Sequence, residues 1–498
     1  MPLFFPKGWE YPIAMECRRF PRRGLAILAI LLAFGCSDAN DASLSVRLTY
    51  PQESVAAGTG HARADGTVRP AYVKVPENRI LIRVLAPHIA TPIEAWFDRS
   101  QGRGEISGIP PGDRIAVEVD EFDNTALTLG TNAPLLGRGF AHGVTLDAGE
   151  NRTVIIPMVD RGTIIRICGA APSGGAGTAG DTGDGGLAVD ALLGQPLAVE
   201  VGPDDSVFVS SAQFNRIRRI DRYGYITHYA GNGPSGTLSE GEPAATATIG
   251  PVYDLDTGPL GDLYLITLDQ QILRINQSTG AISIRYDDQK GIFNPAAKPD
   301  LAVVDDDTIY YTNGMENRVY LVQGGVRSDY VADNTPSQTQ EGADKDFYPL
   351  RYPASVTTDP SGLSVFFCDR DNNKVKFVAT SSSDIFTLIG SSTVVPFTDG
   401  MPPLSMTPEL PVMIKFDRVY GNYFLHERDF YGIRVLRPSN RVYNFAGTGS
   451  IGYAGDGGAA TSALMHDPLS VAIDSRGNVY IADTGNHAIR MVVGGALP

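Results

Sequence analysis

The sequence has little positive charge, few cysteines and only a short apolar run near its start, and each shortage excludes a class of protein. Lysine and arginine total 41 against 56 acidic residues, for a formal net charge of −15. The chain therefore lacks the cationic stripe that a nucleic-acid binder needs. Four cysteines among 498 residues are too few for a disulfide framework. The apolar run at residues 25–34 is too short to cross a bilayer as a helix.

Glycine, proline and aromatic residues are plentiful instead. The chain holds 55 Gly, 34 Pro, 21 Tyr and 20 Phe, a composition typical of short strands joined by tight turns. With 43% hydrophobic and 19% charged residues, the chain is able to bury a large core. We therefore expect an all-β globular protein of two or three domains, or one large repeat array.

The N-terminus has the pattern of an export signal. Four arginines between positions 18 and 23 precede the apolar run, which ends at Gly35 and Cys36. This stretch resembles the lipobox of bacterial lipoproteins, although Ala33 and Phe34 depart from its usual residues. The resemblance implies a signal peptide at residues 1–35, lipidation of Cys36 and a tether at residues 36–42. An ordinary cleaved signal followed by a chance cysteine is the alternative.

The residue after the cysteine and the charge of the mature chain bear on its location. Ser37 in place of an aspartate implies outer-membrane sorting, with the protein periplasmic or surface-facing. Residues 1–35 carry five basic and two acidic side chains, so cleavage takes the charge from −15 to −18. A chain this acidic would be held at a membrane by its acyl chains. Cys168 and Cys368 then remain, and we expect both to be buried free thiols.

Residues 43–160 predict a small β-sandwich. Ile115, Val117 and Val119 alternate with Arg114, Ala116 and Glu118, which is the pattern of a half-buried strand. Further strands are expected at residues 44–48, 80–85 and 154–156, and a loop at 51–78. Residues 104–117 resemble the turn and central strand of prealbumin-like, or carboxypeptidase-regulatory-like, sandwiches. No feature of this region indicates catalysis.

Residues 161–498 contain a repeated unit, which is clearest at residues 447–490. The unit consists, in order, of an apolar strand, a glycine turn, a second strand ending in Asp483, a polar hairpin and a third strand beginning Ile489-Arg490. Asn486, His487 and Ile489 stand at the hairpin. The unit resembles an NHL repeat, and the resemblance implies a β-propeller.

An aromatic residue in the second strand marks six such units, at steps of 56, 46, 56, 57 and 57 residues. Periods of this length that hold several short strands predict propeller blades. A basic residue is expected in the third strand of every unit except the third. The anchors are Phe208, Tyr264, Tyr310, Phe366, Tyr423 and Tyr480.

The last unit has three strands before the chain ends, so its outer strand has to come from elsewhere. Residues 163–168 form an isolated apolar strand before the first unit. We expect this strand to close the sixth blade, which would leave no open edge in the ring.

No pattern in the sequence predicts a catalytic residue, a metal ligand or a cofactor site. The Gly- and Asp-rich loops at 180–186 and 455–458 favour structural turns over a calcium site. Residues 369–373 begin like a calcium-binding loop but lack its glycine and glutamate, so a hairpin tip is expected. No two histidines have zinc-site spacing; they are His61, His88, His142, His228, His426, His466 and His487.

Two functions remain. The NHL resemblance implies a binding or scaffold module that contacts a protein or glycan through the loops of one propeller face, and the lipobox resemblance implies that this module is anchored in the cell envelope. The alternative is a lyase or hydrolase with a metal in the central channel, as in the amidating lyases and lactonases that resemble NHL propellers. His466, before the first strand of the sixth unit, and His426, at the end of the second strand of the fifth, are the histidines that could serve it.

Overall fold

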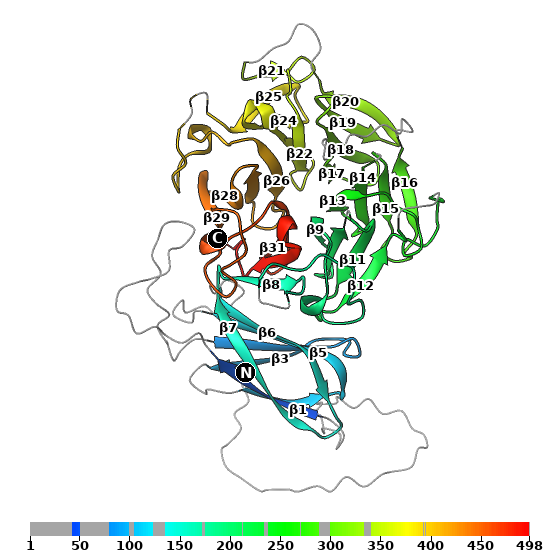
Figure 1. The fold of residues 1–498 in the computed structure, drawn as a ribbon, viewed down its shortest axis with the longest axis vertical. Helices are drawn as coiled ribbons and strands as arrows, with labels where there is room; N and C mark the ends of the chain where they lie inside the picture. The colour runs from blue at the N-terminus through cyan, green and yellow to red at the C-terminus, as the bar shows by residue number, and fades with distance from the viewer. Residues whose placement is uncertain are drawn as a thin grey trace, which may run out of the picture.

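The structure is a computed structural model with two parts, a curled sheet and a ring of six blades (Figure 1). It describes residues 42–49, 79–98, 104–122, 135–171, 175–211, 213–233, 238–268, 270–287, 299–332, 340–391, 393 and 395–497. The signal peptide, Cys36, most of the tether and the expected loop at 51–78 lie outside these residues.

Seven strands form the N-terminal sheet, in the order β3-β2-β5-β6-β7-β1-β4. β1 pairs parallel with β7, and the other pairs are antiparallel. The strands are β1 (Ala42–Thr49), β2 (Arg79–Leu85), β3 (Ile93–Asp98), β4 (Gly104–Ile109), β5 (Gly112–Phe122), β6 (Leu135–Leu146) and β7 (Asn151–Asp160).

The sheet curls around a single core. Ile82 of β2 and Ile109 of β4 belong to the same buried cluster although their strands lie near opposite ends of the strand order. Ile115, Val117 and Val119 point into this cluster, which confirms the alternation read from the sequence. The expected sandwich is thus one continuous sheet whose two halves face each other across the core.

The first three blades each contain four antiparallel strands. Blade 1 consists of β9 (Pro196–Val201), β10 (Val207–Ser211), β11 (Arg216–Ile220) and β12 (Ile226–Ala230). Blade 2 consists of β13 (Val252–Thr257), β14 (Leu263–Thr267), β15 (Ile272–Ile275) and β16 (Ile282–Tyr286). Blade 3 consists of β17 (Leu301–Val303), β18 (Thr308–Asn313), β19 (Arg318–Gln323) and β20 (Val326–Val331).

The last three blades include one additional outer strand, in blade 4. Blade 4 consists of β21 (Ala343–Asp344), β22 (Pro353–Thr358), β23 (Ser364–Asp369), β24 (Lys374–Ala379) and β25 (Asp384–Ile389). Blade 5 consists of β26 (Pro411–Phe416), β27 (Tyr423–Glu427), β28 (Tyr431–Arg437) and β29 (Arg441–Gly449). Blade 6 consists of β30 (Pro468–Ile473), β31 (Val479–Asp483), β32 (Ala488–Val492) and β8 (Ile164–Cys168).

Short 3-10 turns connect some of these strands: η2 (Ala188–Asp190), η4 (Arg370–Asn372), η5 (Pro403–Ser405), η6 (Ala460–Ser462) and η7 (Thr484–Asn486). η4 is the hairpin tip expected at residues 369–373, and Asn373 ends it in the left-handed conformation.

The closure of the ring is as the sequence predicts. β8 precedes blade 1 in the chain, yet it pairs antiparallel with β32, with Ile165 opposite Met491 and Cys168 opposite Ile489. Strands from near the two ends of the propeller sequence therefore share one blade, and the outer edge of β32 is paired.

The observed strand register differs from the predicted repeat in two details. In blade 1 Phe208 pairs with Glu200, and in blade 5 the equivalent pair is Phe424 with Lys415. The anchor of the fifth unit is therefore Phe424, and the prediction of Tyr423 was wrong. The two are adjacent aromatic residues in one strand, so spacing alone does not separate them.

The second correction concerns the basic position of the third strand. Arg218 lies opposite Val209 in blade 1, but Leu273 takes this position opposite Leu265 in blade 2. Arg274 lies opposite Tyr264, one residue further on. The shorter hairpin of the second unit shifts the register by one residue, which turns the arginine to the other face of the blade.

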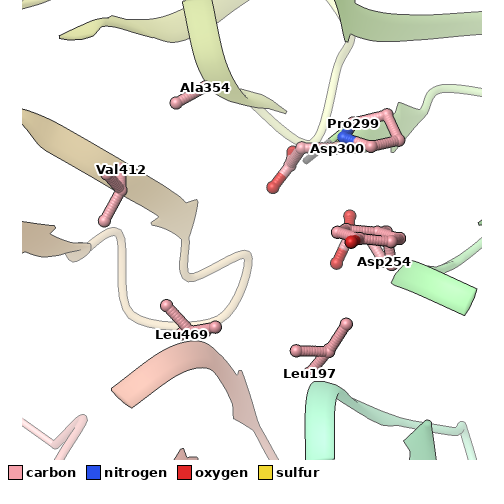
Figure 2. A pocket seen from close by; sticks show the side chains of 8 residues that line it. Leu197, Asp254, Pro299, Asp300, Ala354, Val412 and Leu469 are labelled. Atoms are coloured by element: carbon pink, nitrogen blue, oxygen red, sulfur yellow. The ribbon is translucent and has the colours of Figure 1, made fainter. Parts of the chain in front are cut away.

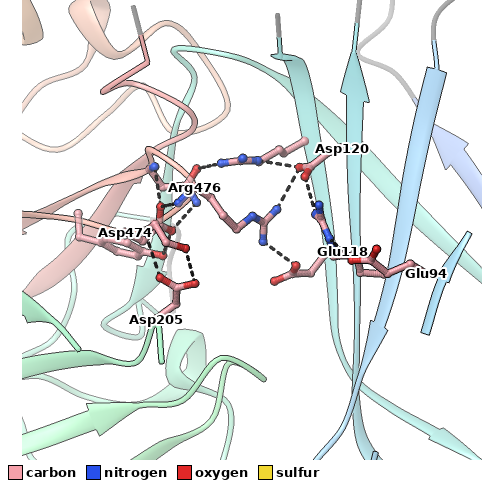
Figure 3. Close-up of polar contacts among 11 residues, drawn as sticks. Glu94, Glu118, Asp120, Asp205, Asp474 and Arg476 are labelled. Atoms are coloured by element: carbon pink, nitrogen blue, oxygen red, sulfur yellow. Dashed lines mark hydrogen bonds and ion pairs between the residues drawn. The ribbon is translucent and has the colours of Figure 1, made fainter. Parts of the chain in front are cut away.

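The N-terminal sheet contacts the two blades that meet at the ring closure. In blade 6, Arg476 binds Glu118 at 2.6 Å and Asp120 at 3.0 Å, as Figure 3 shows. In blade 1, Asp221 accepts a 2.9 Å hydrogen bond from Arg114. Burial opposes the charge of Asp120, but Arg476 and two further arginines outweigh it and hold its pKa well below the usual range.

Both remaining cysteines are buried free thiols, as expected. Cys168 lies in blade 6 and Cys368 in blade 4. Burial raises the pKa of each thiol, so neither is prepared for reaction as a thiolate.

A substitution at Ile164 tests whether β8 closes the ring of blades. This side chain is fully buried in β8 and packs in the core shared by blades 5 and 6. We expect Ile164→Ala to lower the free energy of unfolding by about 2–5 kcal/mol, because it leaves a cavity at the seam. Ile155→Ala is the matched control, since Ile155 is 57% exposed on β7, and should change stability by about 0.5 kcal/mol or less. Similar urea midpoints for the two variants would contradict this role of β8.

Candidate functional site

The candidate site is a cavity at one mouth of the central channel. Each blade contributes the residue just before, or near the start of, its inner strand, and the register makes these residues equivalent. We call this ring the collar. It lines the cavity (Figure 2) and consists of Leu197, Tyr253, Pro299, Ala354, Val412 and Leu469.

Two carboxylates complete the cavity wall. Asp254 and Asp300 follow the collar residues of blades 2 and 3, and Figure 2 shows both carboxyl groups among the lining side chains. Asp254 accepts a hydrogen bond from Leu301 N at 3.1 Å, and Asp300 accepts one from Val356 N at 2.8 Å. In each case the donor belongs to the inner strand of the next blade. These bonds hold the two carboxyl groups at the cavity.

Serines make the equivalent contact between other blades. Ser355 accepts a hydrogen bond from Ile414 N at 3.0 Å, and Ser470 accepts one from Val199 N at 3.2 Å. Together with Asp254 and Asp300, these side chains occupy the same position in four blades. The two other blades have Ala198 and Met413 there, which have no side-chain oxygen to accept such a bond.

Burial changes the protonation of the aspartates. It raises the pKa of Asp254 to about 7, and the charge of Asp256 acts in the same direction. Burial, and then the charge of Asp254, raise the pKa of Asp300 well above its ordinary value. At neutral pH the pair therefore holds at least one proton, and it offers a ligand both a hydrogen-bond donor and acceptors.

Charged side chains cross the channel beyond the aspartates. Lys415 of blade 5 binds Glu200 of blade 1 at 2.8 Å and Asp256 of blade 2 at 3.2 Å. Arg418, in the turn after β26, donates to Val303 O of blade 3 at 3.0 Å. Blade 5 is not a neighbour of blades 1, 2 or 3, so these bonds have to span the channel. They cross it on the side of the aspartates that is remote from the collar.

The ammonium group of Lys415 stays charged at neutral pH. Burial opposes the ammonium of Lys415, but Asp256 and Glu200 outweigh it and raise its pKa. Burial also opposes the Asp256 carboxylate, and Lys415 and Arg418 outweigh it and lower its pKa. The crossing is therefore a charge-compensated cluster with its polar groups already engaged.

The Gly- and Asp-rich loops hold arginines of the third strands. Asp184 accepts from Arg218 Nε at 2.9 Å, and Asp456 accepts from Arg490 Nε at 3.0 Å. Both arginines are nearly or fully buried, and each also donates to two backbone carbonyls of its loop region. The carboxylates that might have bound calcium are thus engaged with arginine, as the structural interpretation of these loops requires.

The six histidines within the described residues are not among the residues that line the cavity. His426 is buried, and its Nδ1 lies 2.9 Å from Gly432 O. His487 is left-handed at the hairpin, and its Nδ1 accepts from Gln195 N at 3.1 Å. His466 is partly exposed, 3.9 Å from Asp467. Within the described ranges, no three His, Cys, Asp or Glu side chains are placed to hold a metal ion.

The acidic pair and the crossing were not predicted from the sequence. The available signal was charge inside apolar inner strands, since Asp254 and Asp256 lie within a six-residue strand that also contains Val252 and Leu255. Charged residues rarely occupy such buried positions without a partner. The partners come from other blades, so local spacing did not reveal them.

The protonation of Asp254 should appear in the pH dependence of stability. The folded state holds a proton that the unfolded chain releases between about pH 4 and pH 7, so this group makes stability fall as pH rises through that window. Asp254→Asn cannot ionise. As the pH rises from 5 to 8, the wild type loses stability through this group and the variant does not. The difference in free energy of unfolding between the variant and the wild type should therefore shift in favour of the variant, on the order of a few kcal/mol.

Thermal melting of the variant and the wild type at pH 5 and at pH 8 measures this change in stability. Asp384→Asn, at an exposed position of β25, is the matched control and should follow the wild type. An identical pH slope for Asp254→Asn and the wild type would contradict a raised pKa.

Comparison with known proteins gives one sequence match and several similar structures. The NHL repeat matches residues 465–490, within the unit in which the sequence pattern predicts it. An auxiliary nutrient binding protein from Bacteroides ovatus is 16% identical, with 83% of this chain and 93% of that chain covered and a TM-score of 0.48. One of the same description from Bacteroides thetaiotaomicron is 13% identical, with 82% and 90% covered and a TM-score of 0.48. The chain thus contains an NHL repeat in its last blade.

Proposed function

We propose that this protein is a binding module of the bacterial cell envelope, whose propeller holds a protein or glycan partner on the collar face. A protruding group of the partner enters the collar cavity. The observation that carries this proposal is a cavity lined by one collar residue from each blade and by two aspartates, with Lys415 and Arg418 spanning the channel beneath it.

The chemistry of the cavity supports binding. Apolar collar side chains surround two hydrogen-bonding carboxyl groups, the usual composition of a ligand pocket. Asp254 and Asp300 are held by backbone N–H groups of neighbouring blades, so they are positioned before a partner arrives. A preorganised site loses little conformational entropy on binding.

The position of the N-terminal sheet supports the choice of face. Arg476 and Asp221, which contact that sheet, lie in turns that follow β30 and β11. The turn after β30 is at the end of the inner strand remote from the collar. The N-terminal sheet therefore contacts blades 1 and 6 at strand ends remote from the collar, beside the ring (Figure 1), and leaves the collar accessible.

The anchor and the division of the chain belong to the same proposal. Residues 1–35 are removed, Cys36 is lipidated, residues 36–42 form the tether, and residues 43–160 and 161–498 are the two domains. None of the described residues forms a helix with the length and hydropathy of a membrane span. In this proposal the acyl chains on Cys36 hold the protein at the outer membrane.

Cys36→Ala tests the anchor. We expect the variant to lose metabolic labelling with palmitate and to move from the membrane to the soluble fraction, because the thiol is the site of acylation. Cys168→Ala, at a buried thiol, is the control and should remain labelled. Continued labelling of the Cys36 variant would contradict the lipoprotein assignment without affecting the collar site.

Photo-cross-linking tests the binding face. A photoreactive amino acid at collar residue Val412 should give discrete adducts in cells, whereas the same group at Leu363, 60% exposed in a turn of the opposite face, should give none. Adding Leu469→Arg should reduce the Val412 adducts at least tenfold by blocking the cavity. Equal adducts from both faces, or none from the collar, would exclude the proposed site.

A further inference from the structure

The N-terminal sheet carries an exposed tryptophan that the propeller site does not use. The sequence has two tryptophans, Trp9 and Trp96, and Trp9 lies in the predicted signal peptide. Trp96 is 50% exposed on β3, the first strand in the order of the sheet. Tryptophan is highly buried on average, so this position is unusual.

Trp96 lies on the sheet face that docks the propeller. The register places Trp96 opposite Leu81, Leu81 opposite Asp120, and Asp120 opposite Arg138. Directly paired residues share a face, so this row crosses four strands on one side. Asp120 and Arg138 are the residues that contact blade 6. The exposed side chains of β3 thus continue the face of an existing interface, and Figure 3 shows Glu94 of that strand.

Trp96 lies between apolar and charged side chains, with the guanidinium carbon of Arg79 5.4 Å from the centre of the indole ring. Leu81 is only 3% exposed, although it points away from the core to which Ile80 and Ile82 belong. The ring centroids of Trp96 and Phe122 are 5.7 Å apart. We call these three residues, with the charged side chains around them, the Trp96 platform; the charged residues are Arg79, Arg83, Glu94 and Asp98.

The size of the platform limits the kind of ligand that it can bind. Its exposed part follows β3, one strand wide and six residues long, which gives roughly 5 Å by 20 Å, or about 100 Å², because the side chains of β2 on this face are mostly buried. A stable protein partner covers about 800 Å² on each side. The platform is therefore too small for a protein interface by itself and suits a small ligand.

The chemistry indicates a sugar. A pyranose ring has an apolar C–H face, which an exposed indole can cover, and hydroxyl groups at its edge. Glu94 and Asp98 are 49% and 59% exposed and pair with Arg83 and Arg79, so acceptors and donors alternate around the indole. The acidic side chains and the negative charge of the chain disfavour anionic glycans.

We propose that the Trp96 platform binds a neutral oligosaccharide, with one sugar ring stacked on the indole. This site is separate from the collar and does not depend on it. It gives the N-terminal sheet a second binding activity in addition to its contact with the propeller.

The chain offers a direct measurement, because a protein that begins at Ser37 has Trp96 as its only tryptophan. The probes are maltotetraose, cellotetraose, chitotetraose and mannotetraose, titrated separately. At least one should give a saturable change in tryptophan emission with a blue shift, because stacking removes water from the indole. Isothermal calorimetry with that sugar should give the same Kd.

Two variants separate the platform from general effects. Trp96→Ala should weaken the calorimetric Kd at least tenfold while melting as a folded protein. Ile155→Ala, at an exposed aliphatic residue of β7 in the same sheet, should bind as the wild type. Trp96→Phe should retain part of the affinity, because the smaller ring still stacks.

Three results would overturn the proposal. The first is that none of the four sugars gives a saturable change. The second is that Trp96→Ala binds as tightly as the wild type. The third is a shift in tryptophan emission that depends on protein concentration in the absence of sugar. Such a shift would mean that a second copy of the chain covers the platform.

Discussion

Side chains that bond to the backbone of the next blade are the interactions on which this site depends. The inner strand of a blade has one edge toward the channel, and its N–H groups there need acceptors because buried donors without partners are costly. Asp254, Asp300, Ser355 and Ser470 supply them from equivalent positions. Two of these acceptors are carboxylates beside the cavity, so the contacts that hold the blades together also give the cavity its polar groups.

Closure of the ring imposes the second constraint. Once β8 joins β32, the six inner strands face one channel, and charged residues on opposite blades come within bonding distance. Lys415, Glu200 and Asp256 have to be close enough to compensate one another, since a lone charge at such a position would be strongly disfavoured. Their cluster spans the channel beneath the cavity that the collar lines. The N-terminal sheet contacts blades 1 and 6, the two blades at which the ring closes.

The repeat made most of the propeller predictable. Each unit carries its own strands and turns, so the number of blades, the order of strands and the missing outer strand could be derived from spacing. Local spacing was insufficient where the hairpin length changed. Leu273 took the position expected of a basic residue, and Phe424 took that of Tyr423, because cross-strand pairing and not distance along the chain decides which face a side chain occupies. The acidic pair could have been suspected from charge within a buried strand, but its partners could not.

The sequence by itself determined the class of fold, the repeat and its closure, because these follow from apolar alternation and turn residues within each unit. Only the tertiary structure decided the site. Lys415 meets partners 215 and 159 residues away, and Trp96 shares a face with Arg138 through two intervening strands. Such contacts depend on ring closure and strand register, which bring together residues that no local pattern connects.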